Sequence, residues 1–254
     1  MRIYLCEDSF EGILTAVYDA WAGRLGHDNV RLELQGEYNL ELFADYVVVL
    51  PDDEKAEKVV RTLRQKLSEE VFEYVYKAAM SQERRKADLI YRFIVLAIQR
   101  GARIVSEFGN PVVMDIFELV RNVSNESHLL LGFIRFQELE NGVLFAKITP
   151  KNYVLTLIAP HFEDRLSGEN WVIYDAVHEM AAVHARNTSW VLSREAKMPE
   201  KLPESGQEEE YEELWKIFFH TIGIEARKNP KCQRNMLPLW YRKNMLEFEN
   251  NENC

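Results

Sequence analysis

The spacing of apolar residues changes near residue 125, and this change limits the fold more than any other feature. Residues 54–122 carry a helical pattern almost throughout, with an apolar stripe through Ile90 and Ile94 and a helix stop at Gly101. Strand patterns follow on both sides of Asn141-Gly142, a dipeptide typical of a two-residue type I′ turn between antiparallel strands. The sequence therefore predicts an α+β fold with an antiparallel sheet in its second half.

The first fifty residues predict a small layer of strands and one helix. Residues 2–6 form a strand pattern, and Ser9 is placed to cap the helix that follows. Two more strands are expected over 30–34 and 46–50, before a charged helix that begins at Pro51-Asp52-Asp53 and runs toward Ala79.

The second half mixes helices and strands. Pro160 should kink or divide the helix expected over residues 152–166. The remaining expected elements are a helix over 112–123, strands over 128–140, 143–149, 171–174 and 189–192, a linker over 197–207 and a helix over 208–225. We expect two closely packed regions, 1–125 and 126–254, because no long flexible linker separates them.

Charge is distributed unevenly along the chain. The formal net charge is −10, yet residues 226–246 hold six basic residues and no acidic one, interleaved with Trp240 and Tyr241. Cations attract phosphates and aromatic faces stack on bases, so this segment is a candidate nucleic-acid site. The opposing interpretation is that the acidic residues of 204–213 neutralise it internally. The candidate binding residues are Arg227, Lys228, Lys231, Arg234, Tyr241 and Arg242.

A second candidate site lies in the middle of the chain. His161 and Arg165 are four residues apart, so on a helix both side chains face the same anion or carboxylate. Asp175, after a predicted strand, is a possible partner for acid–base chemistry. A structural hydrogen-bond network is the competing interpretation of the same three residues.

Other chemistries find little support in the sequence. His178 and His184 are six residues apart, which on a helix puts the imidazoles on different faces, so no metal site is expected. No glycine loop or dinucleotide fingerprint indicates a cofactor. Three scattered cysteines and the lack of a signal-like or membrane-spanning stretch favour a cytoplasmic protein.

Two long stretches resemble a known bacterial family, the domain of unknown function 4130. One is ELWKIFFHTIGIEARKNPKCQRNMLPLWYRKNMLEF, and the other is the strand, Asn-Gly turn, His-Phe-x-x-Arg and Trp-x-Ile-x-Asp succession of residues 132–179. Where that family commonly has a basic residue three positions after the aspartate, this chain has His178. The matching positions are Arg135, His161, Phe162, Arg165, Trp171, Asp175, Arg227, Asn229, Pro230, Gln233, Pro238 and Tyr241.

The resemblance implies a role in DNA metabolism. Members of the family are described as DNA metabolism proteins and are typically encoded beside a radical S-adenosylmethionine (radical SAM) protein proposed to modify or repair DNA. We therefore expect an accessory protein that binds DNA or a nucleotide and works with a radical SAM partner. The alternatives are an enzyme using His161, Arg165 and Asp175, and a protein interaction module without affinity for nucleic acid.

Overall fold

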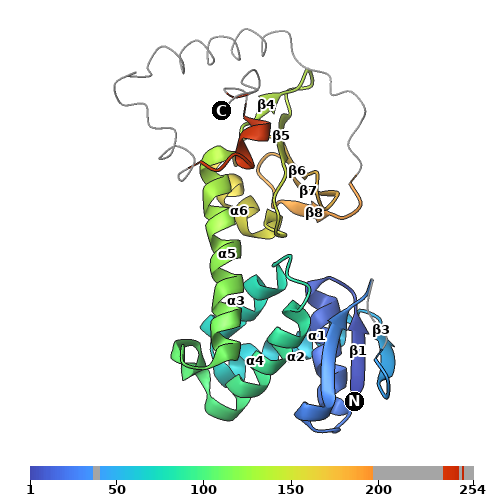
Figure 1. The fold of residues 1–254 in the computed structure, drawn as a ribbon. Coiled ribbons are helices and arrows are strands. Elements are labelled where there is room, and N and C mark those ends of the chain that lie inside the picture. Colours follow the sequence, from blue (N-terminus) through green and yellow to red (C-terminus); the bar gives the residue numbers. More distant parts are fainter. Residues whose placement is uncertain (37–40, 197–236, 246–247, 249–254) are drawn as a thin grey trace. The chain divides into compact units, whose positions relative to one another are not determined.

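The computed structural model describes residues 1–36, 41–196, 237–245 and 248 (Figure 1). Its chain divides into two compact units, Met1–Ser124 and Asn125–Cys254. The α+β class predicted from the sequence is confirmed, because helices accompany a sheet in each unit. The expected linker over 197–207, the helix over 208–225 and the basic residues Arg227, Lys228, Lys231 and Arg234 lie outside the described residues.

The first unit opens with a three-stranded parallel sheet of order β2-β1-β3. Its strands are β1 (Arg2–Cys6), β2 (Val30–Leu34) and β3 (Asp45–Val49), and helix α1 (Phe10–Ala22) contacts all three. Ser9 caps α1 as predicted, since its hydroxyl accepts a hydrogen bond from Gly12 N at 3.0 Å.

The remainder of this unit is helical. Its elements are α2 (Asp53–Thr62), the π-helical turn η2 (Leu63–Leu67), α3 (Glu69–Ala79), α4 (Lys86–Arg100), η3 (Ala102–Ser106) and the first half of α5 (Pro111–Phe133). Gly101 ends α4 with φ of 83°, as predicted. The prediction of one helix from Asp53 to Ala79 is wrong, because Ser68 adopts an extended backbone and caps a new helix through Val71 N.

The second unit contains a mixed five-stranded sheet of order β4-β5-β6-β7-β8. The strands are β4 (Gln137–Glu138), β5 (Leu144–Ile148), β6 (Trp171–Asp175), β7 (Met180–His184) and β8 (Val191–Ser193). The expected all-antiparallel arrangement is wrong for one pair. Strands β5 and β6 are parallel, because helix α6 (Leu155–Arg165) provides the crossover that returns the chain to the same edge.

Three local predictions in this unit also need correction. Helix α5 continues to Phe133, through the first part of the strand expected over 128–140. The observed strand, β4, has only two residues. Strand β7 was not predicted, and His184 is its last residue. The argument that His178 and His184 face different sides of a helix therefore does not apply to these two residues. Pro160 lies inside α6 and does not divide it.

The Asn-Gly hairpin is confirmed, but its turn has three residues rather than two. Gly142 N donates to Leu139 O at 2.8 Å, and Leu139 N donates to Val143 O at 2.9 Å. Only Gly142 has a positive φ, of 75°, whereas a type I′ turn needs positive φ at both central residues. The connection is therefore a type I turn followed by a left-handed glycine.

The core of the second unit lies between its sheet and α6. Trp171 and Ile173 from β6, Ala146 from β5 and Ile158 and Phe162 from α6 are all buried there. Among the described residues, no helix has the length and apolar character to cross a lipid bilayer.

Candidate functional site

The carboxyl ends of β5 and β6 lie at one edge of the sheet, because the two strands are parallel and Ile148 is paired with Asp175. Polar side chains tend to gather at such an edge, and ligands of α/β sheets bind there. Most of the side chains described below come from α5, the segment after β5, the turn after β6, and Trp240 with the short helix η5 (Tyr241–Asn244) that follows it.

Asp175 is a buried acceptor that shapes the turn after β6. Its carboxylate accepts hydrogen bonds from Val177 N at 2.9 Å and His178 N at 3.2 Å, and its Oδ2 lies 2.6 Å from His178 Nδ1. The His178 ring lies 4.0 Å from the ring of Tyr153, centroid to centroid. The aspartate therefore fixes the orientation of an imidazole beside an aromatic ring.

The structure does not join His161 and Arg165 to Asp175. Helix α6 runs from the carboxyl edge of β5 back to the amino end of β6, so Arg165, in its last turn, lies toward the opposite edge from Asp175. His161 and Arg165 are exposed, and no hydrogen bond or ion pair between described residues links either one to Asp175. The hydrogen-bond partner of the Asp175 side chain is the imidazole of His178.

Glu126, near the middle of α5, organises the segment after β5. Its carboxylate accepts from Lys151 N at 2.9 Å, from Asn152 N at 2.8 Å and from Asn152 Nδ2 at 2.6 Å. It also accepts from the Tyr241 hydroxyl at 3.3 Å. This buried carboxylate is satisfied by four donors and holds both the segment after β5 and η5.

Tyr241 and Arg242, two of the predicted binding residues, make intramolecular contacts. Burial, and then the Glu126 carboxylate, raise the pKa of the Tyr241 phenol well above its usual value, and its ring packs on Phe133. Arg242 is buried, donates from Nε to Leu237 O at 3.3 Å and places its guanidinium 4.7 Å from the centre of the Phe248 ring. Tyr241 therefore attaches η5 to α5, whereas the contacts of Arg242 are with its neighbours in the same C-terminal segment.

Trp240, which precedes η5, remains accessible to solvent. It is 37% exposed, and its Nε1 donates to Thr149 O at 2.5 Å, which fixes the plane of the indole. The ammonium groups of Lys243 and Lys151 lie 4.3 and 5.7 Å from the centre of its ring. A fixed, accessible indole with two exposed lysines near its ring is suited to stack on a base while the lysines neutralise phosphates.

The sequence analysis selected Tyr241 and Arg242 as binding residues, whereas the accessible side chains are those of their neighbours Trp240 and Lys243. Lys243 and Trp240 were visible in the basic segment, but nothing in the sequence indicated which members would face solvent. Lys151 and Glu126 carried no signal, because their relation to η5 arises only when distant parts of the chain fold together. Among the described residues, no cluster of histidine, cysteine and acidic side chains could hold a metal ion.

The second unit is thus an α+β module with an aromatic and cationic site at the carboxyl edge of its parallel strand pair. The family model of the domain of unknown function 4130 (DUF4130) matches residues 84–247, and the chain belongs to that family. The match includes every described residue of the site, from Glu126 to Lys243. A search of curated proteins finds no match to the chain.

Proposed function

We propose that this protein binds nucleic acid through the surface formed by Lys151, Trp240 and Lys243, here called the Trp240 platform. The observation that carries the proposal is the accessible indole held by Thr149 O and flanked by two lysines. Stacking of a base on an aromatic ring contributes about 1–3 kcal/mol and does not depend strongly on sequence. Single-stranded nucleic acid, whose bases are free to stack, is therefore the preferred form.

The neighbouring sequence supports the same proposal. Arg227, Lys228, Lys231 and Arg234 precede the platform in the chain, and we propose that they extend the contact along the phosphate backbone. The role that follows is accessory: the protein presents a strand or a modified nucleotide to a radical SAM partner in DNA metabolism or repair, within the cytoplasm. The partner is proposed from the resemblance of the chain to its family.

The decisive experiment is fluorescence anisotropy of labelled single-stranded and duplex DNA with the full chain at several salt concentrations. Trp240→Ala should weaken single-strand binding about tenfold or more, through lost stacking. Phe108→Ala is the matched control, since Phe108 is an aromatic residue of the first unit, is 49% exposed and belongs to neither proposed site, so its loss should not matter. Lys151→Ala and Lys243→Ala should each lower the slope of log affinity against log salt by about 0.7, whereas Lys147→Ala should leave it unchanged.

Two results would reject the proposal. One is binding that Trp240→Ala and the lysine variants leave as tight as in the parent chain. The other is no binding to either form of DNA at low salt; capture of the radical SAM partner by the same preparation would then select the protein interaction module.

A catalytic role is the second candidate, and the Asp175–His178 contact is the observation that favours it. An aspartate that holds one imidazole nitrogen leaves the other nitrogen to exchange a proton with a ligand. In this mechanism the Asp175–His178 pair would act without His161 and Arg165. Turnover of a nucleotide or DNA substrate by the purified chain, lost in His178→Gln with DNA affinity retained, would establish this role.

A further inference from the structure

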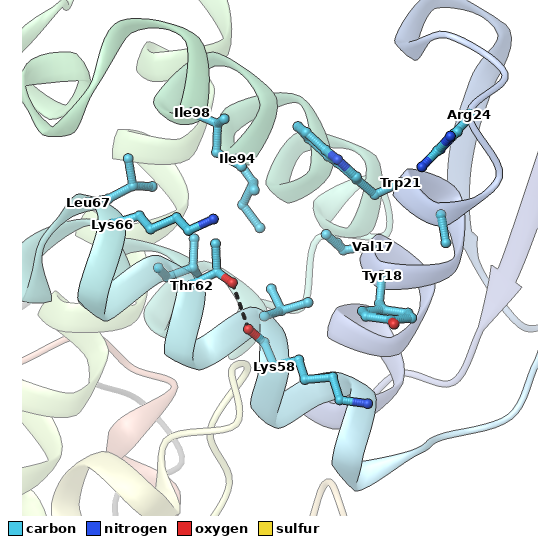
Figure 2. A pocket seen from close by; sticks show the side chains of 13 residues that line it. Val17, Tyr18, Trp21, Arg24, Lys58, Thr62, Lys66, Leu67, Ile94 and Ile98 are labelled. Carbon is cyan, nitrogen blue, oxygen red and sulfur yellow. Dashed lines mark hydrogen bonds between the residues drawn. The ribbon is translucent and has the colours of Figure 1, made fainter.

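The first unit contains a pocket that has no part in the Trp240 platform. It lies between α1, the α2–η2 segment and α4, and has a volume of about 670 Å³ (Figure 2). Pockets that hold small molecules usually measure about 300–1,000 Å³. Most of its lining precedes residue 84, where the match to the family model begins.

The pocket is apolar inside. Val17 and Trp21 come from α1, Leu63 from the start of η2, and Ile94 and Ile98 from α4. Trp21 and Ile98 are 39% and 41% exposed, so the pocket presents uncovered apolar surface to solvent. Burial of this surface by a ligand is favourable by about 25 cal/mol per Å².

The charged residues that line the pocket are all basic. They are Arg24, Lys58 and Lys66, and no aspartate or glutamate of the described residues lines the pocket. Figure 2 shows Lys66 reaching toward the pocket from the η2 side, and Trp21 and Arg24 on the side of α1. An anionic group at the mouth would therefore meet positive charge without a competing carboxylate.

The other basic residues of the α2–η2 segment form ion pairs with carboxylates. Lys55 pairs with Asp19 at 2.8 Å, Arg61 with Glu57 at 3.3 Å and Arg64 with Glu69 at 3.1 Å. Lys58 and Lys66, by contrast, have no ion pair with any carboxylate that the structure describes, and Lys58 only approaches the ring of Tyr18, at 5.7 Å. In a protein with an excess of acidic residues, the cations without a carboxylate partner on this segment are those that line the pocket.

The backbone at the pocket is also unusual. Residues Leu63–Leu67 form a π-helical turn, a rare conformation that appears frequently at functional sites. It follows Thr62, whose hydroxyl donates to Lys58 O at 2.8 Å, and it places Leu63, Lys66 and Leu67 on the pocket wall. The widened turn thus supplies both an apolar wall and one of the cations.

We propose that this pocket binds a small organic anion with a flat or aliphatic apolar body. The body packs against Trp21, Leu63 and Ile94, and the anionic group lies near Lys66, whose side chain reaches toward the pocket (Figure 2). A carboxylate, a sulfonate or a phosphate satisfies this chemistry. The site is independent of nucleic-acid binding at the Trp240 platform.

The test uses anilinonaphthalene sulfonate, a fluorescent aromatic anion, with the full-length chain. We expect one probe molecule per chain and blue-shifted emission. Phenylnaphthylamine, which has the same rings without the sulfonate, should bind about tenfold more weakly. Competition by decanoate and by an aryl phosphate then distinguishes carboxylate ligands from phosphate ligands.

Variants locate the probe. Lys58→Glu/Lys66→Glu should weaken binding of the sulfonate about tenfold or more, and Ala22→Trp should abolish it by filling the pocket. Arg103→Glu, on an exposed site outside the pocket, is the control for a reversed charge. Thermal unfolding shows whether each variant is folded, and Lys58→Gln/Lys66→Gln replaces the reversal if that variant is not.

Several outcomes would overturn the proposal. Equal binding of the neutral and anionic probes would reduce the site to an apolar cavity. Retention of binding in Ala22→Trp, or equal affinities in the lysine and Arg103 variants, would place the probe elsewhere. No binding by the folded parent chain would remove the site altogether.

Discussion

Oδ2 of Asp175 lies 2.6 Å from Nδ1 of His178, and the same carboxylate accepts the backbone N–H groups of Val177 and His178. One buried side chain thus shapes the turn between β6 and β7 and orients an imidazole that packs on Tyr153. The turn itself needs this support, because Glu179 has a positive φ of 54°.

Removal of the Asp175 carboxylate should destabilise the second unit. Asp175→Ala leaves two backbone donors and one imidazole nitrogen without their acceptor, and we expect a loss of about 2–3 kcal/mol in the free energy of unfolding. Asp175→Asn retains an acceptor oxygen for the turn and should lose less. Urea unfolding of the two variants measures the difference, and equal losses would show that the turn does not depend on the acceptor.

Glu126 should not tolerate replacement even by its isostere. Each oxygen of its carboxylate accepts two of the four hydrogen bonds. In Glu126→Gln an NH2 group replaces one of these oxygens, and it cannot accept the two hydrogen bonds that this oxygen received. We expect a loss of about 2 kcal/mol in unfolding free energy, against about 1 kcal/mol for Tyr241→Phe, which removes only one bond. Chemical denaturation of both variants checks the order. A fully stable Glu126→Gln would contradict the four-donor arrangement.

Cys6 should reduce stability at alkaline pH. Burial, and then the nearby Asp8 carboxylate, raise the pKa of its thiol from 9.0 to about 12. Between these values the unfolded chain binds fewer protons than the folded chain, so stability falls as pH rises, by up to about 1.4 kcal/mol per unit. The difference in unfolding free energy between the parent chain and Cys6→Ala should shrink by about 2 kcal/mol from pH 8 to 10.5. A constant difference would rule out this protonation effect.

Two glycines should respond to alanine with opposite signs. Gly142 holds φ of 75° in the hairpin turn, so Gly142→Ala should destabilise by about 1 kcal/mol through backbone strain, although its Cβ would meet nothing closer than 3.9 Å. Gly132 lies in α5 with open space around it, so Gly132→Ala should stabilise by about 0.5–1 kcal/mol. Melting temperatures measure both changes, and the same sign for both would contradict the assigned backbone roles.

The local elements were largely predictable from the sequence because their signals are local. Ser9 and Gly101 have chemistry that fixes a helix end, and the Asn-Gly turn flanked by apolar residues identifies a hairpin. Where short signals competed, prediction was wrong. The largely apolar stretch 128–133 suits a strand or a buried helix equally, and in the structure it forms the end of α5.

By itself, the sequence determined the α+β class, most element types and the presence of a basic, aromatic segment near the C-terminus. The tertiary structure decided which side chains of that segment are accessible. Tyr241 bonds to Glu126 and the buried Arg242 bonds to Leu237, whereas Trp240 remains exposed with Lys151 and Lys243 near its ring. The contacts of Tyr241 with Glu126 and of Trp240 with Thr149 join residues about a hundred positions apart, which no local pattern encodes.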